Sequence, residues 1–460
     1  MKYAPGPKTF WELLKTMIKR QTDPMKFYQD TFAQYGNIVY IRMGQYGYLM
    51  LNDADAIEQV LQTDAKIYIK SNAYERFRLI FGNGLLISSG EIWKKQRRLM
   101  AGAFSGKNIE RLHPLIVNET LQMLDHWSNN SVIDLSEEMN ALTLQIITKS
   151  MLGEIKEEEG VIIRSSVQNM LKYLQTSRHL WLQLILSLFP VKDKVALAIQ
   201  IESRLPLKST RSFFKSIEAI DQFVTKLIDE RRELNKNENL LDMLIKMTDQ
   251  EDQTTMTNQQ LRDEVVNILI AGHETTSNAL SWTFHQLLKY PHVHQKVLEE
   301  ISQNVKGETP SYEELHSLTY TQAVFQESMR LFPPFWRISR KATEATQVKG
   351  FNIPAGTNVI ASIFTVQHSS QYWSDPQEFR PERFLTESPT HHRFAYIPFG
   401  AGPRICIGQN LAMTEAMTIL TICLKKMELI KAFNNDPTFL LSLTLQPKEG
   451  CKVQVKRKVG

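Results

Sequence analysis

The sequence is poor in cysteine, and this shortage excludes several classes of protein. Its 460 residues contain 3 cysteines, Cys406, Cys423 and Cys451, and no two of them form a CxxC pair. The chain therefore lacks the disulfide framework of a small secreted protein and the paired cysteines of a zinc ribbon or a thioredoxin-like site. So few cysteines favour a reducing compartment, and we expect the protein in the cytoplasm.

Long hydrophobic runs and charge of one sign are also scarce. No apolar run reaches the roughly 18 residues that a membrane span needs. Pro5, Gly6 and Pro7 occur before an apolar run could form at the N-terminus, which argues against a secretory signal peptide. The net charge of +5 is small and diffuse, which argues against a nucleic-acid partner. We expect a soluble protein without a membrane span.

The remaining composition is that of an ordinary globular chain, with 42% hydrophobic and 22% charged residues. We find no internal repeat, low-complexity tract or linker, so we predict one domain over residues 1–460. A chain of this length can enclose a buried cofactor.

The hydrophobic pattern predicts a mainly α protein with small β-sheets. Residues 37–43 and 46–51 are rich in β-branched and aromatic residues and predict two strands. Helical periodicity follows from about 91 to 290, including a long apolar helix over 257–290 that Pro291 ends. Strands return at 347–356 and 441–456. We therefore predict one small sheet near each end of the chain, with a helical body between them.

The most informative segment is Phe399-Gly-Ala-Gly-Pro-Arg-Ile-Cys-Ile-Gly408. Gly400, Gly402 and Gly408 allow tight turns and close approach of the backbone to a flat ligand. Turn amides could donate to the sulfur of Cys406, and the dipole of a predicted helix over 411–425 also favours a thiolate.

This segment resembles the haem-binding loop of the cytochrome P450 family, F-x-x-G-x-R-x-C-x-G, at every specified position. The resemblance implies haem b (iron protoporphyrin IX) with Cys406 as the axial ligand of the iron. It places Phe399, Gly402, Arg404 and Gly408 at the cofactor, with Arg404 near a propionate. The alternative, a glycine-rich loop around a buried cysteine, does not explain the other motifs.

Ala271-Gly-His-Glu-Thr-Thr276 interrupts the apolar helix, and its glycine costs about 1 kcal/mol of helix propensity. We expect a functional reason, such as a widened turn beside a ligand. The segment resembles the family's A-G-x-[DE]-T-T motif on the distal side of the haem. The resemblance makes Thr275 and Glu274 catalytic: Thr275 bonds dioxygen, and Glu274 connects the site to a proton source. His273 is expected to be an ordinary surface or core histidine.

Two further arginine motifs match the family. Trp93 and Arg97 are one helical turn apart and resemble its propionate-contacting W-x-x-x-R pair. Arg340 falls where another propionate-binding arginine is often found, although Arg337 competes for the role.

An E-x-x-R pair, Glu327 and Arg330, lies on one helix face, and Arg383 follows downstream. In the family such a pair forms a buried structural triad with that arginine.

The resemblance extends from Pro5 to the C-terminal strands and implies a triangular helical prism around a buried haem. It predicts a monooxygenase that activates dioxygen and hydroxylates a hydrophobic small molecule. We expect a monomer that takes electrons from a separate ferredoxin, flavodoxin or reductase. The alternatives are a haem-thiolate isomerase or peroxygenase on the same fold, and a non-enzymatic haem sensor or carrier.

The substrate is less determined. Local sequence patterns, including Gln96-Arg-Arg-Leu-Met100, resemble those of the branch of the family that contains soluble bacterial fatty-acid hydroxylases and broad-specificity eukaryotic enzymes. We expect a fatty acid first, and a terpenoid or sterol-like molecule second. The residues predicted to line the substrate pocket are Phe77, Leu86, Leu269, Ala271, Phe335, Trp336 and Leu443.

Two surface features complete the sequence-based hypotheses. The apolar segment 181–190 is a candidate lid over the substrate entrance. Lys94, Lys95, Arg98 and Lys107 form a candidate basic surface for an acidic electron donor.

Overall fold

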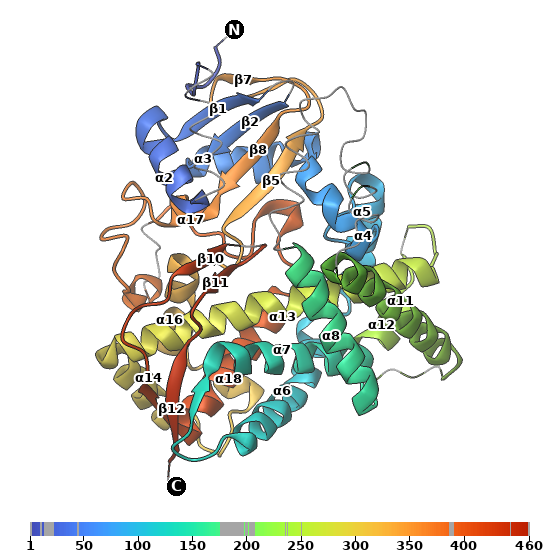
Figure 1. The fold of residues 1–460 in the computed structure, drawn as a ribbon, viewed down its shortest axis with the longest axis vertical. Coiled ribbons are helices and arrows are strands. Elements are labelled where there is room, and N and C mark those ends of the chain that lie inside the picture. The colour runs from blue at the N-terminus through green and yellow to red at the C-terminus, as the bar shows by residue number, and fades with distance from the viewer. Residues whose placement is uncertain are drawn as a thin grey trace.

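The computed structural model describes residues 2–9, 12, 23–43, 46–174, 197, 201, 208–234, 236, 238–249, 251–385, 391–441 and 443–458. The main sheet lies toward the N-terminal end of the molecule, and most helices form a larger body below it (Figure 1). The predicted class, mainly helical with small sheets, is confirmed.

The main sheet combines strands from distant parts of the sequence. Its order is β1-β2-β8-β5-β3, and only the β2–β8 pair is parallel. The strands are β1 Ile38–Met43, β2 Tyr46–Leu51, β3 Tyr68–Lys70, β5 Arg337–Ala342 and β8 Asn358–Ser362. The predicted β1–β2 hairpin is confirmed. The strands predicted at 347–356 and 441–456 form small sheets of their own, but the N-terminal pair also joins β8 and β5 from the second half of the chain.

Three smaller sheets complete the β structure. Their strands are β4 Val132–Asp134 with β12 Lys452–Arg457 and β9 Met427–Lys431; β6 Thr346–Val348 with β7 Phe351–Ile353; and β10 Phe439–Leu441 with β11 Leu445–Pro447. The β10–β11 hairpin lies between the main sheet and α13 (Figure 1).

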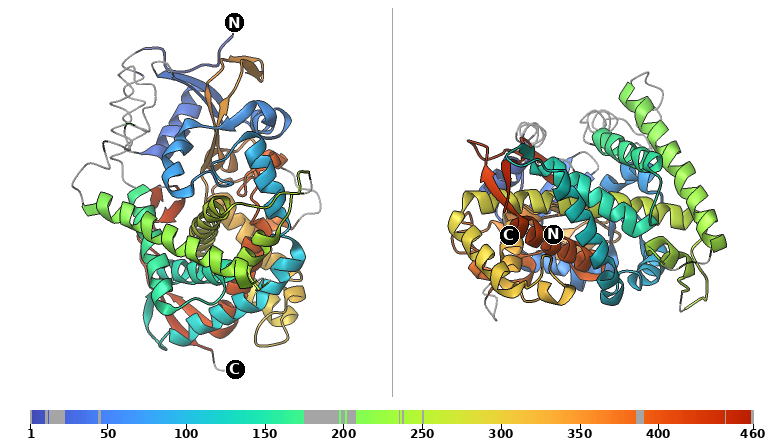
Figure 2. Two further views of the ribbon diagram at one scale, coloured as in Figure 1. Left: turned by 90° about the vertical axis from the view of Figure 1, so that its right-hand side faces the viewer. Right: turned by 90° about the horizontal axis from the view of Figure 1, so that it is seen from below.

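The helical body is built around α13 (Asn258–Lys289), which crosses the molecule and is buried along most of its length (Figures 1 and 2). Within the described residues, the other α-helices are α2 Pro24–Tyr35, α3 Ala54–Glu58, α4 Arg78–Phe81, α5 Gly90–Ala101, α6 Gly106–His126, α7 Leu135–Leu152, α8 Glu157–Leu174, α11 Lys208–Leu234, α12 Leu240–Lys246, α14 Pro291–Asn304, α15 Tyr312–Leu315, α16 Thr319–Leu331, α17 Ile363–Gln367 and α18 Gln409–Lys426.

Helix α13 begins with a capping box, in which the Thr257 and Gln260 side chains each bond the other's backbone N–H. It stays α-helical through Gly272, so the expected widened turn is not present. A Cβ at Gly272 would lie 2.8 Å from a side-chain carbon of Ile147 on α7. The glycine therefore lets α7 and α13 pack closely, which is a reason that the sequence pattern did not reveal.

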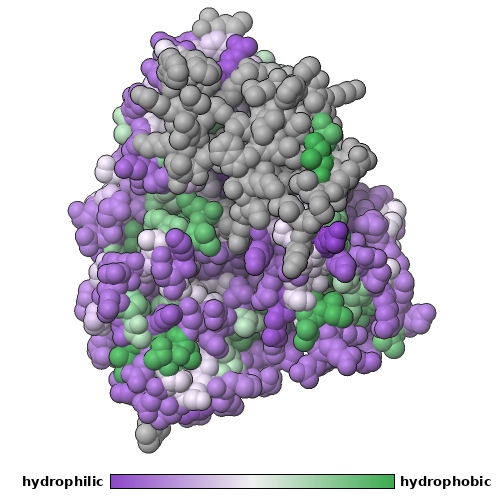
Figure 3. Space-filling view, viewed as in Figure 1, coloured by the Kyte–Doolittle hydropathy of each residue, from purple (hydrophilic) through white to green (hydrophobic). Residues whose placement is uncertain are grey.

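The visible surface is predominantly polar. On the face drawn in Figure 3, hydrophobic residues form small separate patches among hydrophilic ones wherever residues are coloured. Exposed large hydrophobic residues such as Ile92, Val132 and Val161 come from different elements, and scattered single residues of this kind are normal on a protein surface. In the described part of the chain, no helix is both long and apolar enough to cross a membrane.

Candidate functional site

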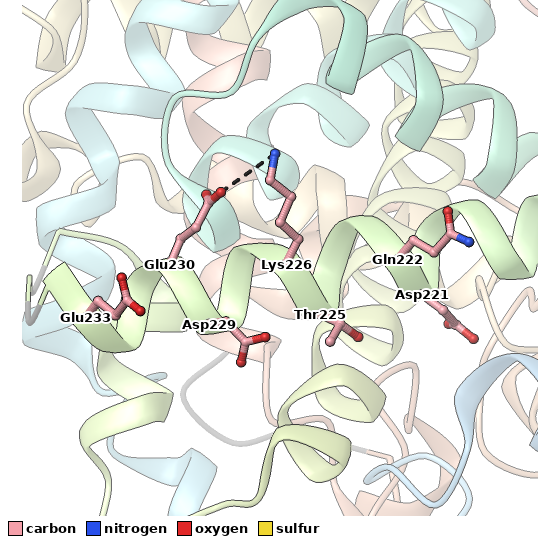
Figure 4. Close-up of a pocket in the computed structure, with 7 residues that line it drawn as sticks. All are labelled: Asp221, Gln222, Thr225, Lys226, Asp229, Glu230 and Glu233. Carbon is pink, nitrogen blue, oxygen red and sulfur yellow. Dashed lines mark ion pairs between the residues drawn. The ribbon is translucent and has the colours of Figure 1, made fainter.

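A cavity of about 270 Å³ lies between α13 and the cysteine loop. Apolar side chains from several elements line much of it: Leu85, Leu86, Ile268, Ala271, Phe335 and Ile338. Cys406 and Thr275 also line it. A second hollow on the surface of α11 is lined by polar side chains of that one helix, including the ion pair Lys226–Glu230 (Figure 4). Only the cavity brings together side chains from helices, strands and the cysteine loop.

The cysteine loop holds Cys406 by backbone contacts. The N–H of Cys406 donates to the carbonyl of Phe399 at 2.9 Å. Gly402 has φ of +67°, and a Cβ there would lie 1.9 Å from the carbonyl oxygen of Leu61. Gly402 therefore seats the loop on the backbone of the short π-helical turn Gln59–Thr63, although it does not line the cavity itself.

The Cys406 side chain is open to the cavity but lies deep in the protein. This burial raises the pKa of its thiol, whereas a hydrogen bond from the N–H of Gly408 and the charge of Arg97 lower it. The amide donor that the sequence analysis expected is therefore present. Phe399 and Gly408, which the resemblance places at the cofactor, also line the cavity.

Five cations line the cavity: Lys70, Arg97, Arg337, Arg340 and Arg404. All except Arg337 are here called the cation cluster. Among the described residues, none of the four forms an ion pair with a carboxylate. Burial and the neighbouring charges of Arg340 and Arg404 hold the pKa of Lys70 well below its usual range. Burial, and then the charge of Arg340, lower the pKa of Arg404 to about 10. Gathered cations without a counter-charge are the setting that an anionic ligand requires.

Neighbouring aromatic residues fix the cation cluster. The guanidinium of Arg404 lies 4.3 Å from the ring centre of Trp93, and the ammonium of Lys70 lies 4.4 Å from that of Tyr74. Arg340 is buried, whereas Arg337 bonds the hydroxyl of Tyr28 at 3.2 Å. Both arginines line the cavity, and the bond from Arg337 to Tyr28 favours Arg340 as the propionate partner. Sequence reasoning missed Lys70, because a single lysine in a short strand belongs to no motif.

Thr275 and Glu274 point in different directions from α13. The Thr275 hydroxyl donates to the carbonyl of Ala271 at 2.9 Å, and its side chain lines the cavity. Glu274 does not line the cavity; its carboxyl accepts hydrogen bonds from Thr444 at 2.8 Å and from Gln446. Burial raises the pKa of this carboxyl, and the two bonds lower it. His273 is a core residue, as expected, and burial lowers its pKa to about 4.

Glu327, Arg330 and Arg383 form a buried triad, here called the paired cluster. Arg330 makes two bonds to the Glu327 carboxylate, at 2.7 and 2.9 Å, and Arg383 approaches it at 3.2 Å. Three backbone carbonyls accept the remaining donors of Arg330. The predicted structural triad is confirmed.

Comparison with known proteins agrees with this geometry. A family model described as Cytochrome P450 matches residues 5–455. The chain belongs to the cytochrome P450 family. Its membership and its relatives make it a P450 monooxygenase, an oxidoreductase of the haem-thiolate class.

Similar proteins come from bacteria and from eukaryotes. Cyclooctat-9-en-7-ol 5-monooxygenase of Streptomyces melanosporofaciens is 28% identical over 402 residues, which are 87% of this chain and 84% of the relative. Cyclooctatin synthase of the same organism is 29% identical over 404 residues, covering 86% and 83%. Cytochrome P450 4d2 of Drosophila melanogaster is 28% identical over 482 residues, covering 98% and 93%.

The residues of this P450 fit a haem on two independent observations. One wall of the cavity presents a single thiol, Cys406, which receives an amide hydrogen bond. The cation cluster supplies positive charge that the described carboxylates do not balance, as two propionates would require. Trp93, Arg97, Arg340 and Arg404, predicted for this role, lie together at the cavity.

The predicted substrate-pocket residues were right in part. Leu86, Ala271 and Phe335 line the cavity of the P450. Phe77, Leu269, Trp336 and Leu443 do not line it, and the first three are buried in the core. The prediction for Leu269 was wrong because Leu269 and Ala271 are two positions apart on α13, and such residues point to nearly opposite sides of a helix. Ile268, three residues before Ala271, lines the cavity instead.

The structure does not support the candidate basic surface, because most of its cations are paired with carboxylates. Lys94 pairs with Glu91, and Lys95 with Asp252. Arg98 contacts the carboxylates of Asp249 and Glu251. These carboxylates neutralise three of the four proposed cations, so α5 does not present them as a free basic surface. The candidate lid, 181–190, lies outside the described residues.

Proposed function

We propose that this P450 hydroxylates a hydrophobic organic substrate with one oxygen atom from dioxygen, using haem b held by Cys406. The carrying observation is a single cavity that has the Cys406 thiol, the cation cluster and the Thr275 hydroxyl on its walls. When bound, the haem supplies the iron at which dioxygen is reduced and its O–O bond is split.

The protein's own residues then have distinct tasks. Cys406 binds the iron as a thiolate, which the Gly408 N–H stabilises. Arg97, Arg340, Arg404 and Lys70 bind the two propionates, and Trp93 keeps Arg404 in place. Phe399 packs at the cofactor from the cysteine loop.

Protons have to reach a cavity whose walls are mostly apolar. Thr275 presents the hydroxyl that can hand a proton to the reacting oxygen, since it lines the cavity in mid-helix. Glu274 is the adjacent carboxyl that can supply the proton. Apolar residues around Thr275 exclude bulk water, which limits loss of the reducing electrons in side reactions.

The substrate that we favour is a cyclic terpenoid alcohol or a similar molecule, ahead of a fatty acid. This choice rests on relatives: two of them are named for cyclooctatin chemistry, and one name specifies an alcohol as substrate. The lining residues Leu86, Ile268 and Ala271 offer an apolar surface that suits either class.

Electrons come, in this proposal, from a separate ferredoxin, flavodoxin or reductase. We propose a cytoplasmic location, which is supported by three free cysteines, two of them buried. We also propose a monomer. The electron donor does not dock on Lys94, Lys95 or Arg98 of α5, because these side chains already form ion pairs within the protein.

The decisive experiment is the spectrum of the reduced, haem-loaded protein under carbon monoxide. The parent should show the thiolate-specific band, and Cys406→Ser should lose it. A band that survives in Cys406→Ser would overturn the assignment of the ligand.

Turnover with a surrogate redox pair separates the alternatives. NADPH consumption should be coupled to product, and Thr275→Ala should divert electrons to peroxide, with roughly a 10²–10⁴-fold loss of coupled rate. An isomerase would form product without NADPH, a peroxygenase with peroxide alone, and a sensor would form none. Spectral titration with a cyclic terpene alcohol and with dodecanoic acid tests the substrate class.

A further inference from the structure

Glu274 and Thr275 are neighbours in sequence but face different surroundings. Thr275 lines the cavity, whereas the carboxyl of Glu274 points to the end of the β10–β11 hairpin. Only 3% of Glu274 is exposed, so bulk water does not solvate its carboxyl directly. Something other than the cavity therefore determines the orientation of this group.

The hairpin supplies two donors to a single oxygen of Glu274. The hydroxyl of Thr444 donates to Oε1 at 2.8 Å, and the side-chain amide of Gln446 donates to the same atom. Asn278, one turn further along α13, donates to the Thr444 hydroxyl at 3.1 Å. Thr444 is 1% exposed, and Gln446 is only partly buried.

The chemistry of these donors favours the ionised carboxyl. A carboxylate only accepts hydrogen bonds, so two donors at one oxygen stabilise it against burial. Without them, a buried carboxyl with no described cation bonded to it would stay protonated. The hairpin thus influences both the direction and the protonation state of Glu274.

We propose that Thr444 and Gln446 are positioning residues that hold the carboxylate of Glu274 against the hairpin as a proton reservoir for the cavity. The proposal rests on the monooxygenase function proposed above. In each cycle Glu274 takes a proton from water at the surface beside Gln446. It then rotates about its side-chain bonds and gives that proton to the Thr275 hydroxyl, which passes its own proton on. Glu274 returns to the hairpin as a carboxylate.

The first test needs no turnover. Infrared spectroscopy of the haem-loaded protein can identify the protonated carboxyl band of Glu274 as the band that Glu274→Gln removes. Thr444→Val should increase this band at neutral pH, and Thr444→Ser should return it to the parent level. A band unchanged in Thr444→Val would overturn the proposal.

The second test measures proton delivery. With a surrogate redox pair, Thr444→Val should lower product formed per NADPH by roughly 10- to 100-fold, as expected for a misplaced catalytic group. It should also increase the solvent isotope effect on product formation. The matched control is Thr283→Val, another buried threonine of the helical body, whose hydroxyl bonds only the Ala279 carbonyl at 2.7 Å among the described residues. Equal effects in both variants would indicate a packing role and sink the proposal.

If Thr444→Val does not fold, Gln446→Leu removes the other donor and should give the same two changes. A parent protein without the thiolate band or without coupled product would refute the proposed function. The infrared result would still show whether the hairpin orients Glu274, so the two failures are distinguishable.

Discussion

The paired cluster and the cation cluster both bury arginines, but they differ in what neutralises them. In the paired cluster, the Glu327 carboxylate bonds Arg330 and Arg383, and backbone carbonyls accept the remaining hydrogen bonds of the Arg330 guanidinium. In the cation cluster, Arg340 and Arg404 find only neutral acceptors and aromatic rings among the described residues. The first arrangement belongs to the fold, and the second is complete only with an anionic ligand. A buried arginine therefore reveals its role by its counter-charge.

The largest effect should follow from removing the counter-charge of the paired cluster. Glu327→Gln leaves Arg330 and Arg383 without their carboxylate, and an uncompensated buried charge costs about 3–5 kcal/mol of unfolding free energy. Chemical denaturation measures the loss. The control is Glu382→Gln, which breaks the exposed pair with Lys296 and should cost about 1 kcal/mol or less. Similar losses in both variants would mean that the triad is not structural.

A buried carboxyl without a cation should show the reverse behaviour. Glu264 is fully buried, and one oxygen accepts from the N–H of Leu85 at 3.0 Å. Its other oxygen has no partner among the described residues, and burial raises its pKa to about 8. Between pH 4.5 and about 8 the unfolded chain has lost this proton while the folded chain keeps it. Stability therefore falls as pH rises through this window.

Glu264→Gln should remove that loss. The unfolding free energy of this variant relative to the parent should increase between pH 5 and pH 8, by up to roughly 4 kcal/mol, because each pKa unit corresponds to about 1.4 kcal/mol. Denaturation at several pH values measures the difference. Glu299→Gln, at an exposed position, should keep a constant offset from the parent. A constant offset in Glu264→Gln as well would show that Glu264 ionises normally.

The smallest effect on stability should come from the cation cluster. Lys70→Met removes a repelled charge, so the apoprotein should be unchanged or more stable by up to about 1 kcal/mol. Haem should dissociate about 10-fold faster, because a propionate loses one partner. Haem transfer to a scavenging apoprotein measures this rate, with the exposed Lys66→Met as control. Destabilised apoprotein with unchanged haem release would assign Lys70 to the fold instead.

Sequence reasoning found those parts of the site that are motifs in one segment. The loop around Cys406, the Trp93–Arg97 pair and the helix with Thr275 each match a family motif within one segment, and all lie at the cavity. What it missed depends on distant contacts. Lys70 meets Arg340 because β3 pairs with β5, and Glu274 meets Thr444 across 170 residues of sequence. The carboxylates that pair with Lys95 and Arg98 come from Asp249, Glu251 and Asp252, a contact that the sequence of α5 does not predict.

The packing of Gly402 against the carbonyl of Leu61 also affects when the haem site can form during synthesis of the chain. The loop that carries the thiol packs on the turn Gln59–Thr63, far earlier in the chain, and β2 pairs with β8 across a similar stretch of sequence. Closing so long a loop is slow, and it needs both ends of the chain to have been synthesised. We therefore expect a nascent chain to acquire its cofactor late, after the N-terminal turn and the cysteine loop have met.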